Sequence, residues 1–223
     1  MRLAKFLPPR FAVSLAFGLS LLALAGSGCQ TAYYAAMEKV GVYKRDLLKK
    51  RVAAARDEQK EAGEQFQDAL TRLKAMYQFD GGELERAYRQ LEADFKQSET
   101  RAKAVRQRIA DMERVAGDLF AEWEKEITQI STPSLQSSSR SQLAQTRARY
   151  ESMRAALDKA SQGMDPVLTQ FRDHVLYLKH NLNAQAIASL KGEATGIQTE
   201  ITRLVAEMNA SIAKADEFIK TLN

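Results

Sequence analysis

The strongest constraint on the fold is a stripe of mostly apolar residues that recur in alternating steps of three and four. Its members are Leu84, Tyr88, Leu91, Phe95, Ser98, Ala102, Val105, Ile109, Met112, Ala116, Leu119, Trp123, Ile127 and Ile130. This spacing places every member on one face of an α-helix, whereas a strand needs an alternation of two. A stripe sustained over so many turns is typical of a coiled-coil seam or of the core-facing side of an antiparallel bundle.

The same rhythm occurs in three other segments, where it predicts core positions that include Leu168 in the third and Ile212 and Ile219 in the last. The places where the rhythm stops divide the chain into helices. The breaks are Phe79-Asp80-Gly81-Gly82, a polar stretch over residues 131–140, and His180-Asn181-Leu182-Asn183. We therefore predict helices over residues 32–77, 83–130, 137–180 and 184–222. The rhythm keeps its phase through Pro166, which favours a kink at this residue over the start of a new helix, and both interpretations stay open.

These segments predict an all-α fold, an elongated antiparallel four-helix bundle or coiled coil with up-down-up-down topology. The chain is rich in Ala, Gln, Glu, Lys, Arg and Leu, a mixture that favours long helices over sheets. At about 1.5 Å per residue, helices of this length make a rod about 65 Å long. A rod of this kind has the shape of a spacer.

A basic and apolar leader precedes the helices and ends at the only cysteine of the chain, Cys29. Arg2, Lys5 and Arg10 form a positively charged region, residues 11–25 form an apolar region, and small residues lead up to the cysteine. This order is similar to that of a bacterial lipoprotein signal, in which the cysteine thiol receives a lipid and the chain is cut just before it.

The resemblance implies a signal peptide over residues 1–28 and a single mature domain over residues 29–223, with Cys29 as the lipid-attachment residue. Gln30 follows the cysteine at a position where an inner-membrane retention signal usually has Asp. The resemblance therefore favours the bacterial cell envelope, at the inner leaflet of the outer membrane and facing the periplasm.

Two alternatives for the leader stay open. Ala23-Leu24-Ala25 also fits an ordinary cleavage site, which would release a soluble protein that begins at Gly26. Gly26 itself stands where lipoprotein signals prefer Leu. An uncleaved membrane anchor fits less well, because the apolar region of 15 residues falls short of the roughly 20 that span a bilayer.

Charge and residue types exclude several classes of function. Residues 1–28 contain three of the 33 basic residues and no acidic residue, which leaves 30 basic against 28 acidic side chains. This near balance of charge does not indicate a nucleic-acid-binding protein, which needs a strongly basic surface. His174 and His180 are turned about 240° apart on a helix, so they share no face for a metal ion. We find no catalytic constellation and expect no metal, no cofactor and no enzymatic activity.

Two groups of residues are candidate contact surfaces. A basic patch early in the first helix comprises Lys44, Arg45, Lys49, Lys50 and Arg51, and it could touch anionic lipid headgroups near the anchor. A solvated helix face is the alternative for this patch. The second candidate is a tip far from the lipid, where two turns would meet, formed by Phe79, Asp80, Lys179, His180, Asn181 and Asn183.

The tip draws on residues 174–192, which contain two His, two Lys and two Asn but no Asp or Glu. These donors suit an acidic or carboxylate-bearing partner, either a protein or a cell-wall polymer. Turns that merely close a bundle are the alternative explanation, because Asn and Gly are ordinary turn residues.

Three segments resemble a group of proteobacterial lipoproteins classed as a domain of unknown function: Tyr33-Tyr34-Ala35-Ala36-Met37-Glu38-Lys39-Val40-Gly41-Val42-Tyr43-Lys44-Arg45-Asp46, Phe79-Asp80-Gly81-Gly82, and Val175-Leu176-Tyr177-Leu178-Lys179-His180-Asn181-Leu182-Asn183-Ala184. The resemblance implies an all-helical lipoprotein and no assigned activity. We expect a spacer, adaptor or scaffold of the cell envelope that could form homo-oligomers. The alternative is a binding protein for a small ligand or an envelope polymer at the lipid-distal turns.

Overall fold

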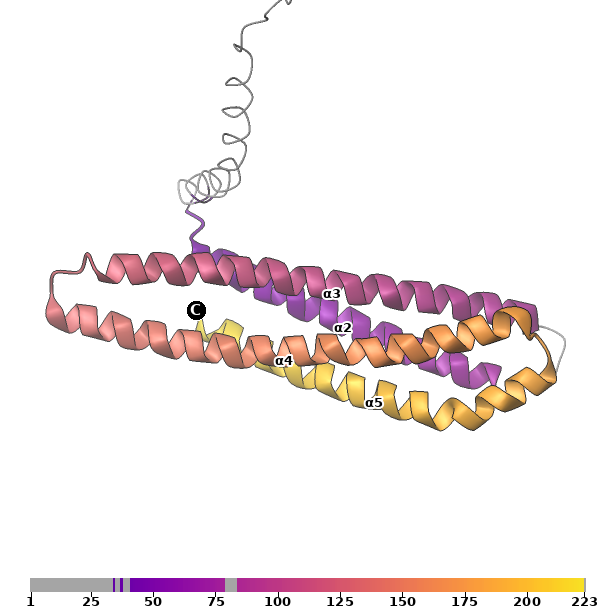
Figure 1. Ribbon diagram of the computed structural model, residues 1–223. Coiled ribbons are helices and arrows are strands. Elements are labelled where there is room, and N and C mark those ends of the chain that lie inside the picture. Colours follow the sequence, from indigo (N-terminus) through magenta and orange to yellow (C-terminus); the bar gives the residue numbers. More distant parts are fainter. Residues whose placement is uncertain (1–33, 35–36, 38–40, 79–83, 223) are drawn as a thin grey trace, which may run out of the picture. The chain divides into compact units, whose positions relative to one another are not determined.

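The computed structural model describes residues 34, 37, 41–78 and 84–222, and the chain divides into two compact units, Met1–Lys44 and Arg45–Asn223. The described helices are α2 (Lys44–Met76), α3 (Leu84–Ile127), α4 (Pro133–His180) and α5 (Ala184–Thr221). Figure 1 shows the four helices of the second unit lying along one another. No strand occurs among the described residues. The predicted all-α four-helix bundle is confirmed.

Contacts between side chains fix the direction of each helix. Arg56 of α2 pairs with Asp216 of α5 (2.6 Å), and Gln59 lies beside Ser211 (2.8 Å), so residue numbers rise on one helix while they fall on the other. Along α2 and α4 they rise together. Gln59 of α2 contacts the Leu157 carbonyl of α4 at 3.4 Å. Tyr77, which follows α2 directly, contacts His174 of α4 at 3.1 Å.

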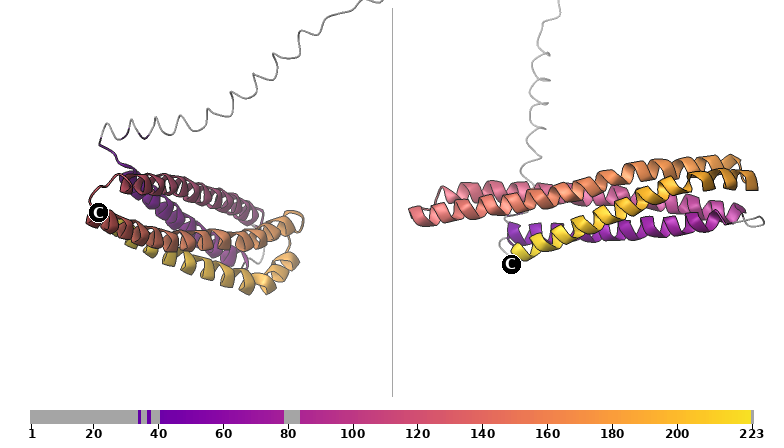
Figure 2. Two further views of the ribbon diagram at one scale, coloured as in Figure 1. Left: turned by 60° about the vertical axis from the view of Figure 1, so that its left-hand side comes forward. Right: turned by 90° about the horizontal axis from the view of Figure 1, so that it is seen from below.

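The same argument orders the remaining pairs. Arg106 of α3 pairs with Asp165 of α4 at 2.6 Å, and Glu113 of α3 pairs with Arg154 of α4 at 3.0 Å. α3 and α4 are therefore antiparallel. Lys159 on α4 reaches Glu207 on α5 at 3.1 Å. Further along this pair, Gly163 allows a close approach, since a Cβ added to it would lie 3.2 Å from Leu204 Cδ1. The helices therefore alternate in direction (Figure 2).

The predicted stripe on α3 forms the core along most of its length. Its buried members are Leu91, Phe95, Ser98, Ala102, Val105, Ile109, Met112, Ala116 and Ile127. Aromatic rings meet edge to face between helices, with centroids 5.9 Å apart for Phe95 and Phe171 and 5.4 Å apart for Phe120 and Tyr150. This geometry is favoured by the ring quadrupoles and adds to the burial of apolar surface.

A polar layer interrupts the apolar core near the middle of α2. Gln59 is fully buried, and its amide nitrogen lies 3.4 Å from the Leu157 carbonyl oxygen of α4. The hydroxyl of buried Ser211 on α5 lies 2.8 Å from Gln59 Oε1 and 2.8 Å from the Met208 carbonyl oxygen. A buried amide that finds partners on two other helices fixes their relative positions, because a shift along the bundle would leave it unsatisfied.

The core-facing positions differ from the predicted stripe near the end of α5. Ser211 and Phe218 are buried there, whereas Ile212 and Ile219 are half-buried. On α4, Val167 is buried in place of the predicted Leu168. A helix with 3.6 residues per turn drifts relative to a strict seven-residue pattern, so a stripe drawn with constant phase leaves the core face after several turns.

The predicted start of the first helix at residue 32 is wrong as a continuous helix. Tyr34 and Met37 are helical, but Gly41 adopts a left-handed conformation with φ of 78°, and α2 begins only at Lys44. The Val42 amide donates to the Met37 carbonyl at 2.9 Å, the long hydrogen bond of a Schellman cap around a left-handed glycine. Gly41 therefore ends the preceding helical turn.

The connection between α3 and α4 is shorter than predicted. α3 ends at Ile127 and α4 begins at Pro133, so most of the serines assigned to a loop over residues 131–140 lie inside α4. Proline is favoured at the first position of a helix because its missing amide hydrogen would have no partner there. α4 also continues through Pro166, as the unbroken rhythm predicted.

The helices differ in length, and the difference shapes one end of the bundle. α3 and α4 have 44 and 48 residues, whereas α2 and α5 have 33 and 38. Figure 1 shows the α3–α4 hairpin extending past the start of α2 and the end of α5. We refer to this end as the hairpin end. The opposite end, where α2 and α4 finish, is the two-turn end.

Candidate functional site

The ends of α2 and α4 lie together at the two-turn end, as the topology predicted. The Tyr77 hydroxyl is 3.1 Å from His174 Nδ1, and the two rings meet edge to face with centroids 6.4 Å apart. Both side chains are buried. Of the predicted tip residues, Phe79 and Asp80 lie outside the residues that the structure describes.

The other tip residues fall into two groups. Asn181 donates from its side chain to the Tyr177 carbonyl at 2.9 Å, and Asn183 accepts from the Ala186 amide at 2.9 Å. These bonds cap helix ends and explain both asparagines without a partner. Lys179 and His180 are exposed. The exposed apolar side chains Leu176 and Tyr177 precede them on the last turns of α4, so the surface offers basic and apolar groups together.

His174 is a buried titratable group, and its environment disfavours the charged form. Burial lowers the pKa of His174 below the ordinary value of 6.5, although Asp173 and Glu193 act in the opposite direction. A neutral imidazole can accept the hydrogen bond from the Tyr77 hydroxyl at Nδ1. The same burial raises the pKa of Tyr77, so the phenol keeps its proton.

We expect the bundle to lose stability as the pH falls below about 6.5, the ordinary pKa of histidine. In that range the unfolded chain takes up a proton on His174 more readily than the folded chain, so protonation favours unfolding. Above this pH, His174 is neutral in both the folded and the unfolded chain. His174→Gln, which keeps a polar partner for Tyr77, should therefore lose less stability than the wild type between about pH 7.5 and about pH 5.

Urea unfolding at several pH values checks this prediction. His180→Gln is the matched control, because it removes an exposed histidine six residues away. The control should follow the wild type. A pH dependence of the unfolding midpoint that is the same in wild type and in His174→Gln would show that His174 does not titrate during unfolding.

The basic patch lies on the first two turns of α2. Arg45 and Lys50 are exposed, while Lys44, Lys49 and Arg51 are half-buried. Leu47, Leu48 and Val52 of the same turns are buried in the core. The apolar side of the segment is thus fixed by packing, and the cationic groups occupy the remaining side.

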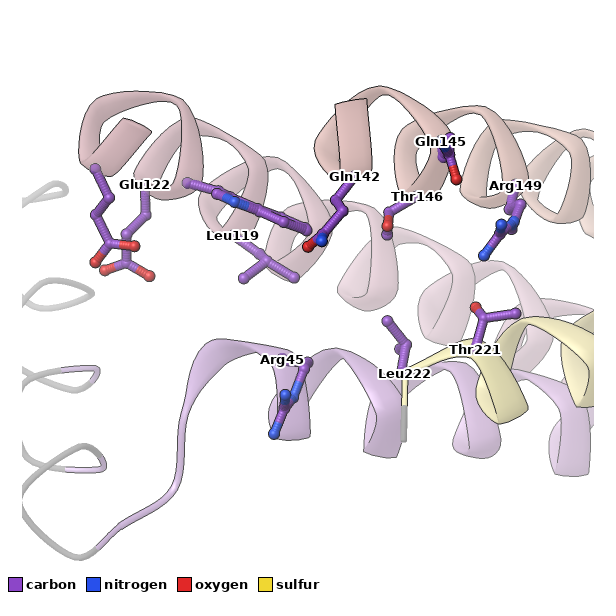
Figure 3. Close-up of a pocket in the computed structure, with 11 residues that line it drawn as sticks. Arg45, Leu119, Glu122, Gln142, Gln145, Thr146, Arg149, Thr221 and Leu222 are labelled. Carbon is purple, nitrogen blue, oxygen red and sulfur yellow. The ribbon is translucent and has the colours of Figure 1, made fainter. Parts of the chain in front are cut away.

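A pocket at the hairpin end was not expected from the sequence. Its volume is about 480 Å³, and side chains from all four helices line it. Its lining residues are Arg45, Leu119, Glu122, Trp123, Glu126, Gln142, Gln145, Thr146, Arg149, Thr221 and Leu222. Figure 3 shows that most of these side chains converge on a space between the hairpin and the ends of α2 and α5. We refer to it as the end pocket.

Trp123 is the residue whose role differs most from the sequence prediction. Its place on the stripe predicted core packing, but the side chain is only half-buried and lines the end pocket. Its indole Nε1 donates to the Ser139 hydroxyl across the hairpin at 2.9 Å. The stripe continues beyond the ends of α2 and α5, so its last turns have only α4 to pack against.

Two features that would indicate other kinds of site do not occur among the described residues. No three His, Cys, Asp or Glu side chains in residues 41–78 and 84–222 are grouped so that they could hold a metal ion. Over the same ranges, no helix combines the length and the apolar character needed to cross a membrane.

Comparison with known proteins identifies a family. No curated protein and no solved structure matches the chain. The family described as Protein of unknown function (DUF2959) matches residues 33–222, a stretch that contains all four helices of the bundle. Because this match extends over most of its length, the chain belongs to the DUF2959 family.

Proposed function

We propose that the protein is a lipoprotein of the bacterial cell envelope that is anchored through Cys29 and acts as a spacer, adaptor or scaffold. Its place is the inner leaflet of the outer membrane, with the helical bundle in the periplasm. A leader of the lipoprotein type, with Arg2, Lys5 and Arg10 before an apolar region and the only cysteine, supports the anchoring.

The observation that carries the proposal is the form of the unit Arg45–Asn223, four long antiparallel helices around a core filled by their own side chains. With 48 residues at about 1.5 Å each, α4 is about 70 Å long. A closed core of this length is suited to hold a distance between two points or to present its ends to partners.

The basic patch supports a second contact with the membrane. Its residues follow Cys29 by 15 to 22 positions, so the start of α2 remains near the anchor along the chain. Basic side chains near anionic headgroups add about 1 kcal/mol each to membrane binding. The two signals together would hold the bundle more firmly than the lipid alone.

The two-turn end is the proposed place of contact with an envelope protein or a cell-wall polymer. Lys179 and His180 are exposed beside Leu176 and Tyr177, and no acidic residue occurs between positions 174 and 192. A partner surface that carries carboxylates would find cationic and apolar groups together at this end.

In-cell crosslinking tests the adaptor role. We expect a photoreactive residue at position 177, which is exposed, to form a specific crosslink. Lys179→Ala with His180→Ala should reduce its yield severalfold by removing two donors. The control is Lys103→Ala with Lys125→Ala, which removes two exposed cationic groups from α3. An equal yield in both double variants, with folding intact, would mean that the two-turn end is not the contact surface.

A further inference from the structure

We propose that the end pocket binds an extended peptide segment of a partner protein, with a basic group at one end of the segment and an acidic group at the other. The proposal rests on the proposed adaptor function and names the chemistry of one partner. It assigns this contact to the hairpin end, at the opposite end of the bundle from Lys179 and His180.

The position of the end pocket makes it a junction of the whole bundle. The lining includes Arg45 of α2, Trp123 of α3, Arg149 of α4 and Thr221 of α5. A volume of about 480 Å³ lies within the range of sites that enclose small ligands. A ligand bound there would contact all four helices at once.

The charges of the pocket are balanced, and Figure 3 shows Arg45 on the same side of the pocket as Leu119, away from Arg149. Arg45 and Arg149 oppose Glu122 and Glu126 in its lining. Figure 3 shows Glu122 and Arg149 at opposite ends, with Gln142 and Thr146 between them. In the part of the chain that the structure describes, neither Arg149 nor Glu126 forms an ion pair. Arg149 and Glu126 are therefore available to bind opposite charges on a ligand.

The middle of the pocket is suited to a peptide backbone. Each glutamine amide of Gln142 and Gln145 can donate and accept a hydrogen bond, which matches the alternating groups of a main chain. Leu119, Trp123 and Leu222 supply apolar surface for side chains. A tryptophan in such a pocket offers a large contact area and loses little conformational entropy.

Other ligand classes fit this arrangement less well. A phosphate or a nucleotide would gain from the arginines but would be repelled by the two glutamates. A neutral glycan would leave both charged ends without a partner. A phospholipid headgroup carries its ammonium and phosphate side by side, whereas Glu122 and Arg149 lie at opposite ends of the pocket (Figure 3). The distance between Glu122 and Arg149 therefore favours an extended chain.

Selection from a phage-displayed library of random peptides against the purified full-length protein tests the proposal. We expect enriched peptides with a basic residue near one end, an acidic residue near the other and apolar residues between them. Because Trp123 is the only tryptophan of the chain and lines the pocket, its fluorescence reports binding directly. Titration of the enriched peptide should give a saturable change.

Three variants locate the binding. Arg149→Gln should weaken binding about tenfold by removing a charge-assisted hydrogen bond. Thr146→Phe should abolish it by filling the pocket. Thr199→Phe, the matched control on the exposed side of α5, should bind like the wild type.

The proposal is overturned if no peptides are enriched over background, or if Thr146→Phe and Thr199→Phe affect binding equally. Enriched peptides without opposite terminal charges would also contradict it. Membrane attachment and crosslinking at position 177 are measured on the same variants. If both persist while peptide binding is absent, the peptide proposal is wrong and the proposed anchoring and adaptor function stands.

Discussion

Leu204→Asp is expected to unfold the bundle or to remove most of its stability. Leu204 is 1% exposed and packs against Gly163 at the close approach of α4 and α5. The variant loses the burial of a leucine, worth about 1.5 to 3 kcal/mol, and also places a carboxylate in an apolar core without a partner. The sum is at least about 4 kcal/mol, against a total stability of about 5 to 15 kcal/mol for an ordinary domain.

Circular dichroism during urea unfolding measures this effect. Leu176→Asp is the matched control, because Leu176 is 53% exposed on α4 and the same substitution removes little buried surface there. Its unfolding midpoint should stay close to that of the wild type. Equal midpoints for Leu204→Asp and the wild type would contradict the packing of α5 against α4.

Gln59→Ala is expected to destabilise the bundle by about 3 kcal/mol. The substitution empties part of a fully buried site and removes the amide that lies 3.4 Å from the Leu157 carbonyl and 2.8 Å from the Ser211 hydroxyl. A cavity and the lost hydrogen bonds each cost about 1 to 3 kcal/mol. The effect is smaller than that of a buried charge because no ion loses its solvation.

A second variant separates the stability of this layer from its role in alignment. Gln59→Met with Ser211→Ala replaces the polar layer by apolar groups and should recover most of the loss, because no buried donor remains unsatisfied. We expect less cooperative unfolding in urea, since the bonds that position α2 against α5 are absent. A double variant that is as unstable as Gln59→Ala alone would mean that the polar bonds themselves supply the stability.

The helical rhythm made the bundle predictable, because the spacing of apolar residues is a local pattern that recurs in every turn of each helix. The buried members of α3, from Leu91 to Ala116, follow it closely. Two boundaries that we misplaced also had local signals. Gly41 can occupy the left-handed position that ends a helix, and Pro133 is a favoured first residue of one. A stripe that continued across the glycine and a run of serines after the proline obscured them.

The end pocket could not be predicted from the sequence because no local pattern encodes it. It exists because α3 and α4 are longer than α2 and α5, which leaves Trp123 on a seam without its full set of neighbours. The lining residues come from four helices, and Arg45 and Leu222 stand near the two ends of the bundle sequence. Only the alignment of the helices in space brings them together.

Mass spectrometry of the mature N-terminus tests whether the protein is anchored through Cys29. We expect the first residue to be Cys29, with a diacylglyceryl group on its sulfur and an acyl chain on its amine. The Cys29→Ser variant should then appear as an unprocessed precursor or in the soluble fraction. An unmodified mature chain that begins at Gly26, or a wild-type chain that keeps residues 1–28, would mean that Cys29 is not a lipid anchor.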